Sequence, residues 1–291
     1  MPTFAKVKLQ PSASEDGTLG IDIGASKVRY VIWEKGQALL DKEVKLLEPR
    51  REELQRIFQE IAQKIKETRI SAVGVGIPGT VEEGVISYAP NFPALLGWDF
   101  KPELEKLLGA PVRLFNDAKA AVVAEVQAGA AKGKRNVIGL TLGSGLGGGL
   151  FLNGALYLGK GTAGEVGHEI VDLPNRKEAE DFASAKFFQK FGADANALRE
   201  QAEKGDKSAR QTFAEFGQNL GIVIANLVNL LDPEIIILGG GISGAYDLFI
   251  EAARNASRKF IVNPQRQKIE IKKAALGASA GAIGAAILAG L

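Results

Sequence analysis

Two glycine-rich stretches of the chain share one pattern of apolar and glycine residues, and this repetition restricts the fold more than any other feature. LGIDIGASKVRYVIWEKGQALL, residues 19–40, aligns with IGLTLGSGLGGGLFLNGALYLG, residues 138–159. The matched pairs at the strand ends are Gly20 with Gly139, Asp22 with Thr141, and Gly24 with Gly143. Each stretch reads as a strand, a glycine turn and a returning strand. The repeat predicts two related α/β halves that each contribute a glycine hairpin to a shared cleft.

The remaining sequence alternates strands with helices. Residues 51–67 carry a helical apolar stripe, and residues 70–79 form an apolar strand that ends in Gly-Pro-Gly. Residues 112–130 read as a short strand turning directly into an Ala-rich helix. Residues 216–241 read as a long helix, a break at Asp232-Pro233, a strand and a glycine loop. This alternation is typical of α/β proteins.

Composition excludes several classes of protein and site. The 36 basic residues nearly balance the 34 acidic ones, so nothing indicates a general nucleic-acid or membrane binder. The absence of cysteine excludes disulfides and thiolate metal sites. The N-terminus has no signal-peptide pattern, and the apolar C-terminus offers about 14 helical residues where a span needs about 20. We therefore expect a soluble, cytoplasmic protein.

The glycine turns are candidate phosphate sites. Without Cβ atoms, consecutive backbone N–H groups can point at one anion. Asp22 stands beside the first turn, where Ser26 and Lys27 add a hydroxyl and a charge, and its carboxylate could hold Mg²⁺ through water. A third glycine run, LGGGISG at 238–244, follows a strand and opens a helix, a common place for a nucleotide. The alternative is that these turns merely close hairpins.

The strand-to-helix junction at residues 116–117 allows two interpretations. Asp117 can be an ordinary helix N-cap. It can also be a carboxylate in a cleft that accepts a proton from an attacking hydroxyl. Composition does not separate the two. The single histidine, His168, has a similar ambiguity between a metal ligand, an acid–base group and a polar structural residue.

Several motifs together resemble the ROK family of sugar kinases and sugar-responsive repressors. The longest is LGSGLGGGLFLNGALYLGKGTAGEVGH at residues 142–168. The others are DIGASK, GIPGTV, APNFPALLGW, FNDAKAAVVAE, LGGGIS and the small-residue C-terminal helix, in the family's order. Together they cover nearly the whole chain.

The resemblance implies an α/β, two-domain, actin-like ATPase fold (ribonuclease H-like) in which ATP and sugar meet in an interdomain cleft. We expect an N-terminal domain of residues 1–117, with the helix 279–291 packing back on it, and a C-terminal domain of residues 118–278. The family commonly forms homodimers, so dimerisation is an expectation as well.

Roles for individual residues follow from the same resemblance. Asp117 matches the general base that deprotonates the sugar's 6-hydroxyl. The residues expected to bind the sugar, besides Asp117, are Gly79, Asn91, Asn116, Glu165, His168 and Glu180. The residues expected to bind ATP are Asp22, Gly24, Ala25, Ser26, Lys27, Thr141, Gly143, Ser144, Gly145, Gly239 and Gly240, with Mg²⁺ at Asp22.

The sequence departs from the family after His168. Many members continue into a cysteine-rich segment that binds structural Zn²⁺ together with that histidine, whereas this chain continues EIVDLPNRKEAEDFAS. Without thiolates, Asp172 or Glu178 would be poor substitutes, so we expect no zinc. About 17 residues precede the first expected strand, with no recognition-helix pattern, so we expect no DNA binding.

The leading hypothesis is an ATP-dependent hexokinase acting on glucose and related hexoses, with ATP and Mg²⁺ as cofactors. The alternative enzyme is a kinase for N-acetylglucosamine or N-acetylmannosamine. The alternative from another class is a sugar-binding sensor without catalysis.

Overall fold

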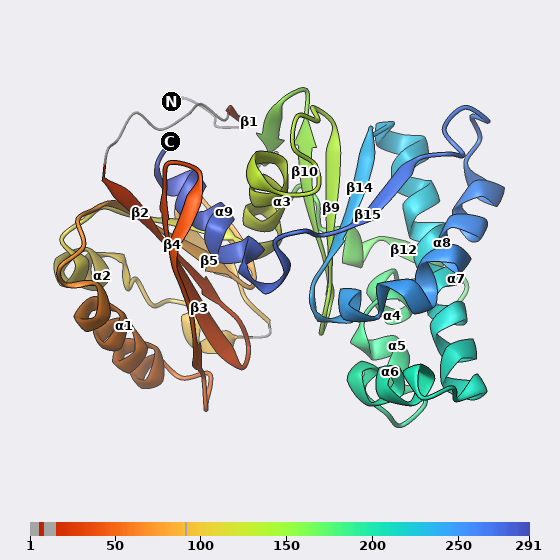
Figure 1. Cartoon of the computed structure of the whole chain (residues 1–291), viewed down its shortest axis with the longest axis horizontal. Helices are drawn as coiled ribbons and strands as arrows, with labels where there is room; N and C mark the ends of the chain where they lie inside the picture. Colours follow the sequence, from red (N-terminus) through yellow and green to blue (C-terminus); the bar gives the residue numbers. More distant parts are fainter. Residues whose placement is uncertain (1–5, 9–15, 91) are drawn as a thin grey trace.

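The structure is a computed structural model that describes residues 6–8, 16–90 and 92–291. Asn91, which we expected in the sugar pocket, lies outside the described residues. Two main β-sheets stand side by side, with helices between them and on their outer faces (Figure 1).

The first sheet belongs to the N-terminal half. In the described part of the chain its strand order is β4-β3-β2-β5-β8. The strands are β2 (Gly17–Ile23), β3 (Lys27–Glu34), β4 (Gln37–Lys45), β5 (Ile70–Ile77) and β8 (Val112–Asn116). The predicted hairpin is confirmed, because β2 pairs antiparallel with β3. On its other side β2 pairs parallel with β5.

The second sheet repeats this topology. Among the described residues it runs β1-β11-β10-β9-β14-β15, with β9 antiparallel to β10 and parallel to β14. Its strands are β1 (Lys6–Lys8), β9 (Val137–Leu142), β10 (Leu146–Leu152), β11 (Ala155–Tyr157), β14 (Ile235–Gly239) and β15 (Glu270–Lys273). The predicted internal repeat is therefore confirmed as a repeated strand order. No pattern in the sequence predicted β1, a short edge strand paired with β11.

The other elements are shorter hairpins and the helices. The hairpins are β6 (Thr80–Glu82) with β7 (Val85–Tyr88), and β12 (Ile170–Asp172) with β13 (Lys177–Glu178). The α-helices are α1 (Arg51–Ile65), α2 (Lys101–Leu108), α3 (Asp117–Ala128), α4 (Glu180–Ala183), α5 (Ala185–Gln189), α6 (Ala195–Glu203), α7 (Lys207–Leu231), α8 (Tyr246–Phe260) and α9 (Ala280–Ala289). The 3₁₀ helices are η1 (Pro93–Leu95), η2 (Val166–His168), η3 (Gly241–Ala245) and η4 (Gly277–Ser279).

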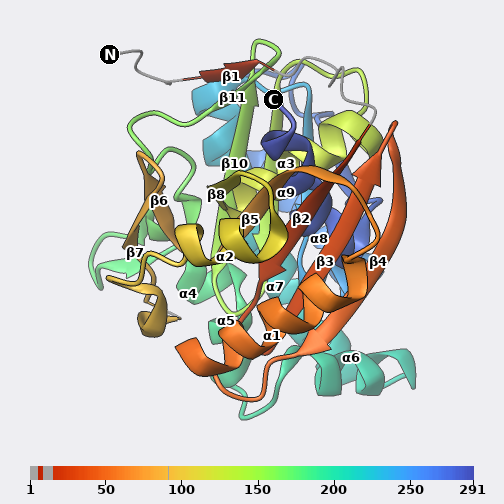
Figure 2. The ribbon, with the colours of Figure 1, turned by 90° about the vertical axis from the view of Figure 1, so that its left-hand side faces the viewer.

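The helices and sheets form layers. The apolar stripe of α1 is buried in one hydrophobic cluster with alternate residues of β2 and β5, and α1 and α2 stand outside the first sheet (Figure 2). The helices α7 and α8 pack on each other and stand on the outer side of the second sheet (Figure 1). Between the two sheets lie α3 and α9, which contact each other, with α9 on β2 and β5 and α3 on β9 and β10.

The middle layer is packed so closely that backbones touch. A Cβ atom at Gly20 of β2 would lie 1.8 Å from the Ala282 carbonyl oxygen of α9. A Cβ atom at Gly74 of β5 would lie 1.9 Å from the Ala285 carbonyl oxygen. Only glycine leaves room for such an approach. The apolar C-terminal run is thus a buried helix fitted against glycine strands.

The buried Glu125 joins α3 to the connector that leads from β15 to α9. Its carboxylate accepts hydrogen bonds from the backbone N–H groups of Ala130, Ala275 and Leu276, at 2.8, 3.1 and 2.8 Å. These bonds satisfy a carboxylate that is only 2% exposed. They anchor the start of the last helix.

No helix of the described residues combines the length and the apolar character that crossing a bilayer requires. The division into domains at residues 117 and 118, with the last helix assigned to the first domain, stays a proposal. The boundary falls in the first turn of α3, and α9 contacts β2 and β5.

Replacing Gly74 with alanine tests the middle layer. Gly74→Ala inserts a methyl group against the α9 backbone, so we expect the free energy of unfolding to fall by about 1–3 kcal/mol or more. The control is Gly241→Ala, because a Cβ atom there meets nothing within 4 Å. Denaturant unfolding measures both variants. Equal stability of Gly74→Ala and the wild type would contradict the close approach.

Candidate active site

The first glycine turn closes the β2–β3 hairpin. The Gly24 N–H group donates to the Lys27 carbonyl at 2.9 Å, and Ala25 and Ser26 between them are exposed. The Lys27 ammonium pairs with Glu43 of β4 at 2.8 Å. The turn is therefore open to an anion, with its lysine held at the rim.

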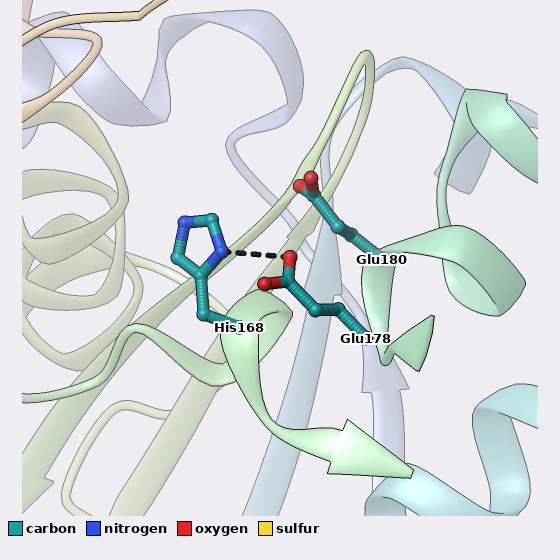
Figure 3. A group of neighbouring side chains, drawn as sticks. All are labelled: His168, Glu178 and Glu180. Carbon is teal, nitrogen blue, oxygen red and sulfur yellow. Dashed lines mark hydrogen bonds and ion pairs between the residues drawn. The ribbon is translucent and has the colours of Figure 1, made fainter. Parts of the chain in front are cut away.

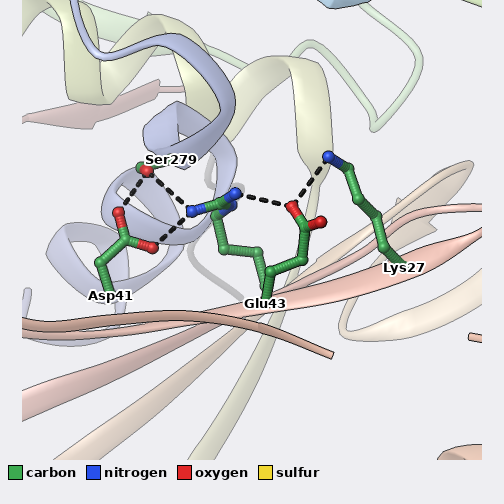
Figure 4. A network of polar contacts seen from close by, with 5 residues as sticks. Lys27, Asp41, Glu43 and Ser279 are labelled. Atoms are coloured by element: carbon green, nitrogen blue, oxygen red, sulfur yellow. Dashed lines mark hydrogen bonds and ion pairs between the residues drawn. The ribbon is translucent and has the colours of Figure 1, made fainter. Parts of the chain in front are cut away.

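A polar network stabilises the strands beside this turn. The Arg29 guanidinium donates to Asp41 and to Glu43, each at 2.6 Å, and Asp41 also accepts a hydrogen bond from Ser279 (Figure 4). Ser279 immediately precedes α9. The network thus connects the first hairpin to the start of the last helix.

The second and third glycine segments come together in the second sheet. The Gly143 N–H group donates to the Gly145 carbonyl at 3.0 Å, and Ser144 between them is exposed. Thr141 and Gly239 are paired on neighbouring strands. Gly240 has a φ of +82°, and a Cβ atom there would lie 2.4 Å from the Leu142 carbonyl oxygen, so this position requires glycine. No hydrogen bond among the described residues joins these segments to the turn at 24–27.

Asp22 ends β2 beside the middle layer. A Cβ atom at Gly281 of α9 would lie 2.3 Å from Asp22 Oδ2, so the carboxylate packs directly on the first turn of that helix. Burial is the main cause that raises its pKa, and the Asp117 carboxylate adds to it. Lys27 and Arg29 act in the opposite direction, and the resulting pKa is about 7. Asp22 forms no side-chain hydrogen bond with the described residues.

Asn116 and Asp117 occupy the junction of β8 and α3. The helix N-cap is Asn116, whose Oδ1 accepts from the Lys119 N–H group at 2.9 Å, so the reading of Asp117 as the N-cap is wrong. The Asn116 amide also donates to the Gly79 carbonyl at 2.9 Å. Asp117 is the first helical residue, and its Oδ1 accepts from the Ala118 N–H group at 2.8 Å.

The Asp117 carboxyl lies in an acidic environment. Burial raises its pKa most, the Ala118 N–H group lowers it and Glu165 raises it, giving a pKa of about 6. Gly76 lies between Asp22 and Asp117: a Cβ atom at Gly76 would lie 3.1 Å from Asp22 Oδ1 and 3.7 Å from the Asp117 Cα atom. The structure therefore brings together the predicted phosphate-side residue and the predicted base.

A cavity of about 220 Å³ separates the β6–β7 hairpin from the segment 162–168. Its lining residues are Thr80, Glu82, Ser87, Tyr88, Thr162, Glu165 and His168. Gly79 lies against this hairpin, since a Cβ atom there would stand 2.1 Å from the Tyr88 carbonyl oxygen. A larger cavity, about 650 Å³, lies between α8 and β15 and includes none of the predicted site residues.

His168 and Glu180 belong to one cluster with Glu178 (Figure 3). His168 Nδ1 and Glu178 Oε2 are 2.9 Å apart, and this contact raises the pKa of the imidazole. The Glu180 carboxylate reaches the second glycine turn, because a Cβ atom at Gly145 would lie 2.8 Å from Glu180 Oε2. Lys186 forms an ion pair with Glu180.

Metal binding has two candidate positions among the described residues. His168, Glu178 and Glu180 place one potential ligand atom each within 4.8 Å of one another. Asp22 offers a single half-buried carboxylate with no hydrogen-bond partner in the described chain, and carboxylate oxygen suits Mg²⁺. The expected absence of zinc stays a prediction.

Sequence reasoning missed Lys119, a lysine that is only 3% exposed. Its ammonium donates to the Gly161 carbonyl in the loop that leads to Glu165. Burial lowers its pKa, and Glu165 opposes that effect. The available signal was a charged residue inside an Ala-rich helix, two positions after the candidate base. Gly76 and Gly281 were also missed, and Glu178 was considered only as a poor substitute metal ligand, because the roles of all three depend on contacts between separate segments.

Comparisons with known proteins point to one family over nearly the whole chain. A sequence model described as the ROK family matches residues 18–290. The glucokinase of Streptomyces coelicolor is 32% identical over 94% of this chain and 97% of its own length. The N-acetylgalactosamine kinase AgaK of a Shewanella species is 29% identical over 92% of this chain and 95% of its own length.

The fold is shared with a solved relative. The ROK family glucokinase of Streptomyces griseus, crystallised with glucose and AMPPNP, has a TM-score of 0.81 and 29% sequence identity. The likeness covers 94% of this chain and 99% of that one. The predicted fold class, α/β with two actin-like domains, is confirmed.

Replacing Lys119 tests its hold on the loop before Glu165. Lys119→Met leaves the Gly161 carbonyl without this donor, so we expect amide hydrogen exchange in residues 159–165 to accelerate about 10-fold. The control is Lys132→Met, an exposed lysine just beyond the same helix. Exchange followed by mass spectrometry measures the change. Unchanged protection of the loop in Lys119→Met would contradict this role.

Proposed function

The chain belongs to the ROK family, and on that premise we propose that it is an ATP-dependent hexose kinase that phosphorylates glucose and related hexoses at the 6-hydroxyl. The observation that carries the proposal is the position of Asp117. Asp117 lies across Gly76 from Asp22, and its carboxyl interacts electrostatically with both Asp22 and Glu165. A group placed between a phosphate site and a sugar site can serve a transfer between them.

Asp117 is our candidate general base. Its Oδ1 accepts from Ala118, which leaves Oδ2 for the substrate hydroxyl. With a pKa of about 6, the carboxyl is ionised at neutral pH and is a stronger base than an exposed aspartate. In the proposed step the sugar's 6-oxygen attacks the γ-phosphorus of ATP while its proton passes to Asp117 and ADP leaves.

The nucleotide would be bound by the glycine turns. The Gly24 and Gly143 N–H groups already donate within their own turns, so the phosphates would be met by the other backbone N–H groups of the segments 24–27, 143–145 and 239–240. Asp22 would hold Mg²⁺, through water, beside the first turn. When bound, that ion neutralises part of the charge on the phosphates.

The sugar would be bound by Glu165, His168 and Glu180, with the Asn116 amide and Gly79 on the opposite side. Two of these residues line the 220 Å³ cavity, a volume below the roughly 300–1,000 Å³ of pockets for drug-sized ligands. Carboxylates and an imidazole recognise adjacent hydroxyls specifically, because leaving such groups unpaired costs free energy. Asn91, the remaining expected contact, lies outside the described residues.

The alternative enzyme is an N-acetylhexosamine kinase, acting on N-acetylglucosamine or N-acetylmannosamine. The similarity to the Shewanella N-acetylgalactosamine kinase supports it. The Tyr88 backbone fills the space on the Cβ side of Gly79, so that side has no room for an acetamido group. A sensor without catalysis would retain the sugar residues but would have no need of the two carboxyls flanking Gly76. We further propose that the protein forms a homodimer. We also propose that it does not bind nucleic acid.

The Asp117→Asn variant tests the function and the base together. We first measure ADP release by the wild type with glucose, mannose, fructose, glucosamine, N-acetylglucosamine and N-acetylmannosamine, and expect glucose to give the highest kcat/KM. With the best sugar, Asp117→Asn should lose about 10²- to 10⁴-fold in kcat while calorimetry shows sugar binding within a few-fold of the wild type.

Asp99→Asn is the matched control, because Asp99 is exposed and is not among the proposed site residues. Wild-type turnover in Asp117→Asn would eliminate the proposed base. Absence of sugar-dependent ADP release by the wild type with every sugar would favour the sensor.

The pH dependence of catalysis follows from the raised pKa of Asp117. A base must be deprotonated to act, so at saturating Mg²⁺, which keeps Asp22 (pKa about 7) deprotonated, kcat/KM should be constant well above pH 6 and fall about 10-fold per pH unit below it. Initial rates between pH 4.5 and 8, with circular dichroism to verify folding at each pH, measure the profile. A profile that stays flat down to about pH 4.5 would contradict the proposed environment of Asp117.

A further inference from the structure

Two of the proposed sugar-binding side chains are each held by a residue outside the predicted site. His168 Nδ1 contacts Glu178 Oε2 at 2.9 Å, and the Glu180 carboxylate pairs with the Lys186 ammonium. Neither Glu178 nor Lys186 lines the cavity that contains Glu165 and His168. The two pairs form one corner of the site (Figure 3 draws three of the four residues).

Glu178 is placed opposite His168 by a short hairpin. His168 ends η2, and the β12–β13 hairpin then pairs Ile170 with Glu178. The Glu178 N–H group donates to Asp181 Oδ2 at 3.1 Å, which holds the backbone on the α4 side. The contact of the two side chains is therefore supported from both ends of the loop.

The contact selects one arrangement of the imidazole. A carboxylate oxygen only accepts hydrogen bonds, so Nδ1 carries the proton that it donates to Glu178. The ring orientation is then set, and Nε2 is the nitrogen left for a ligand. A free imidazole would have to give up rotational freedom when the sugar binds.

Lys186 and Glu180 are joined through the junction of α4 and α5. Ser184 Oγ donates to the Glu180 carbonyl at 2.6 Å and accepts from the Lys186 N–H group at 3.1 Å. The Ala185 N–H group donates to the Gly143 carbonyl at 2.8 Å, which ties the junction to the second glycine turn. Lys186 thus stands on a constrained backbone beside the carboxylate it pairs with.

Charge gives Lys186 a second role. Glu165, Glu178 and Glu180 all act electrostatically on His168. Carboxylates this close repel one another unless cations lie among them. The Lys186 ammonium supplies one such charge, and its pKa is raised by its hydrogen bond to Glu180 and by nearby acidic groups.

We propose that Glu178 and Lys186 are positioning residues that hold the His168 imidazole and the Glu180 carboxylate in place for the sugar hydroxyls. The inference deepens the proposed function and rests on it. In this arrangement the Lys186 ammonium offsets the negative charge of the neighbouring carboxylates, as a bound metal ion could otherwise do.

Variants at Glu178 test the first pair. We expect Glu178→Ala to raise the sugar Kd and KM about 10-fold with kcat within about 2-fold, and Glu178→Gln, whose amide oxygen can still accept from Nδ1, to recover part of the loss. Glu215→Gln, an exposed glutamate of α7, is the matched control. Calorimetry measures Kd without turnover, and thermal melting verifies folding.

Deoxy sugars separate positioning from a general structural effect. With 1-deoxy-, 2-deoxy- and 3-deoxyglucose, the Glu178→Ala penalty should disappear for the analogue lacking the hydroxyl that His168 contacts and persist for the others. Equal penalties for all analogues would overturn the inference.

Variants at Lys186 test the second pair. Lys186→Met should raise Kd and KM about 10-fold, and Lys186→Arg should recover part of the loss because it retains the charge. Lys207→Met, at an exposed lysine, is the control. Unchanged Kd and KM in both Glu178→Ala and Lys186→Met would overturn the proposal.

Metal content is measured for every variant. One equivalent of metal in the wild type that Glu178→Ala loses would make the corner a metal site and overturn the proposal. The proposed function has a separate failure: no ADP release with any sugar, even if calorimetry still detects binding that depends on Glu178.

Discussion

The contact between the glycine strands and the last helix is the constraint on which the rest of the structure depends. Gly20 and Gly74 let the α9 backbone touch β2 and β5, and Gly284 lets α9 touch α3 at Ala120. This packing sets the distance between the two sheets. It also brings Gly281 against Asp22, so the carboxylate at the end of the first strand is desolvated by the last helix. A side chain at any of these glycines would separate the layers.

The two halves of the chain contribute different groups to the candidate active site. The N-terminal half supplies Asp22 and Asp117 from neighbouring parts of one sheet edge, with Gly76 between them. The C-terminal half supplies the second glycine turn and the loop that carries Glu165 and His168. Lys119 stands on α3 two residues after Asp117 and donates to Gly161, so it links the start of this helix to that loop. Burial raises the pKa of both aspartates, which costs stability but makes Asp117 a stronger base.

Many elements of the fold could be predicted from the sequence, because local patterns of residues specify them. The two hairpins, the strand-to-helix junction at Asn116 and the strand before Gly239 follow from apolar periodicity and glycine positions. One interpretation of the sequence made Asp117 the helix N-cap, whereas the structure has Asn116 there. The two differ by one residue, and both side chains suit that position. The strand β1 was missed because three residues carry too little periodicity, and its pairing with β11 is set by distant residues.

The sequence by itself determined the repeated α/β halves, the family and the residue types available for phosphate, sugar and proton transfer, because these reside in order and spacing along the chain. Only the tertiary structure decided which of these residues meet. Asp22 faces Asp117 across Gly76, Glu180 reaches Gly145, and His168 is held by Glu178. The physical reason is that packing distances and desolvation arise between segments far apart in sequence, where no local pattern records them.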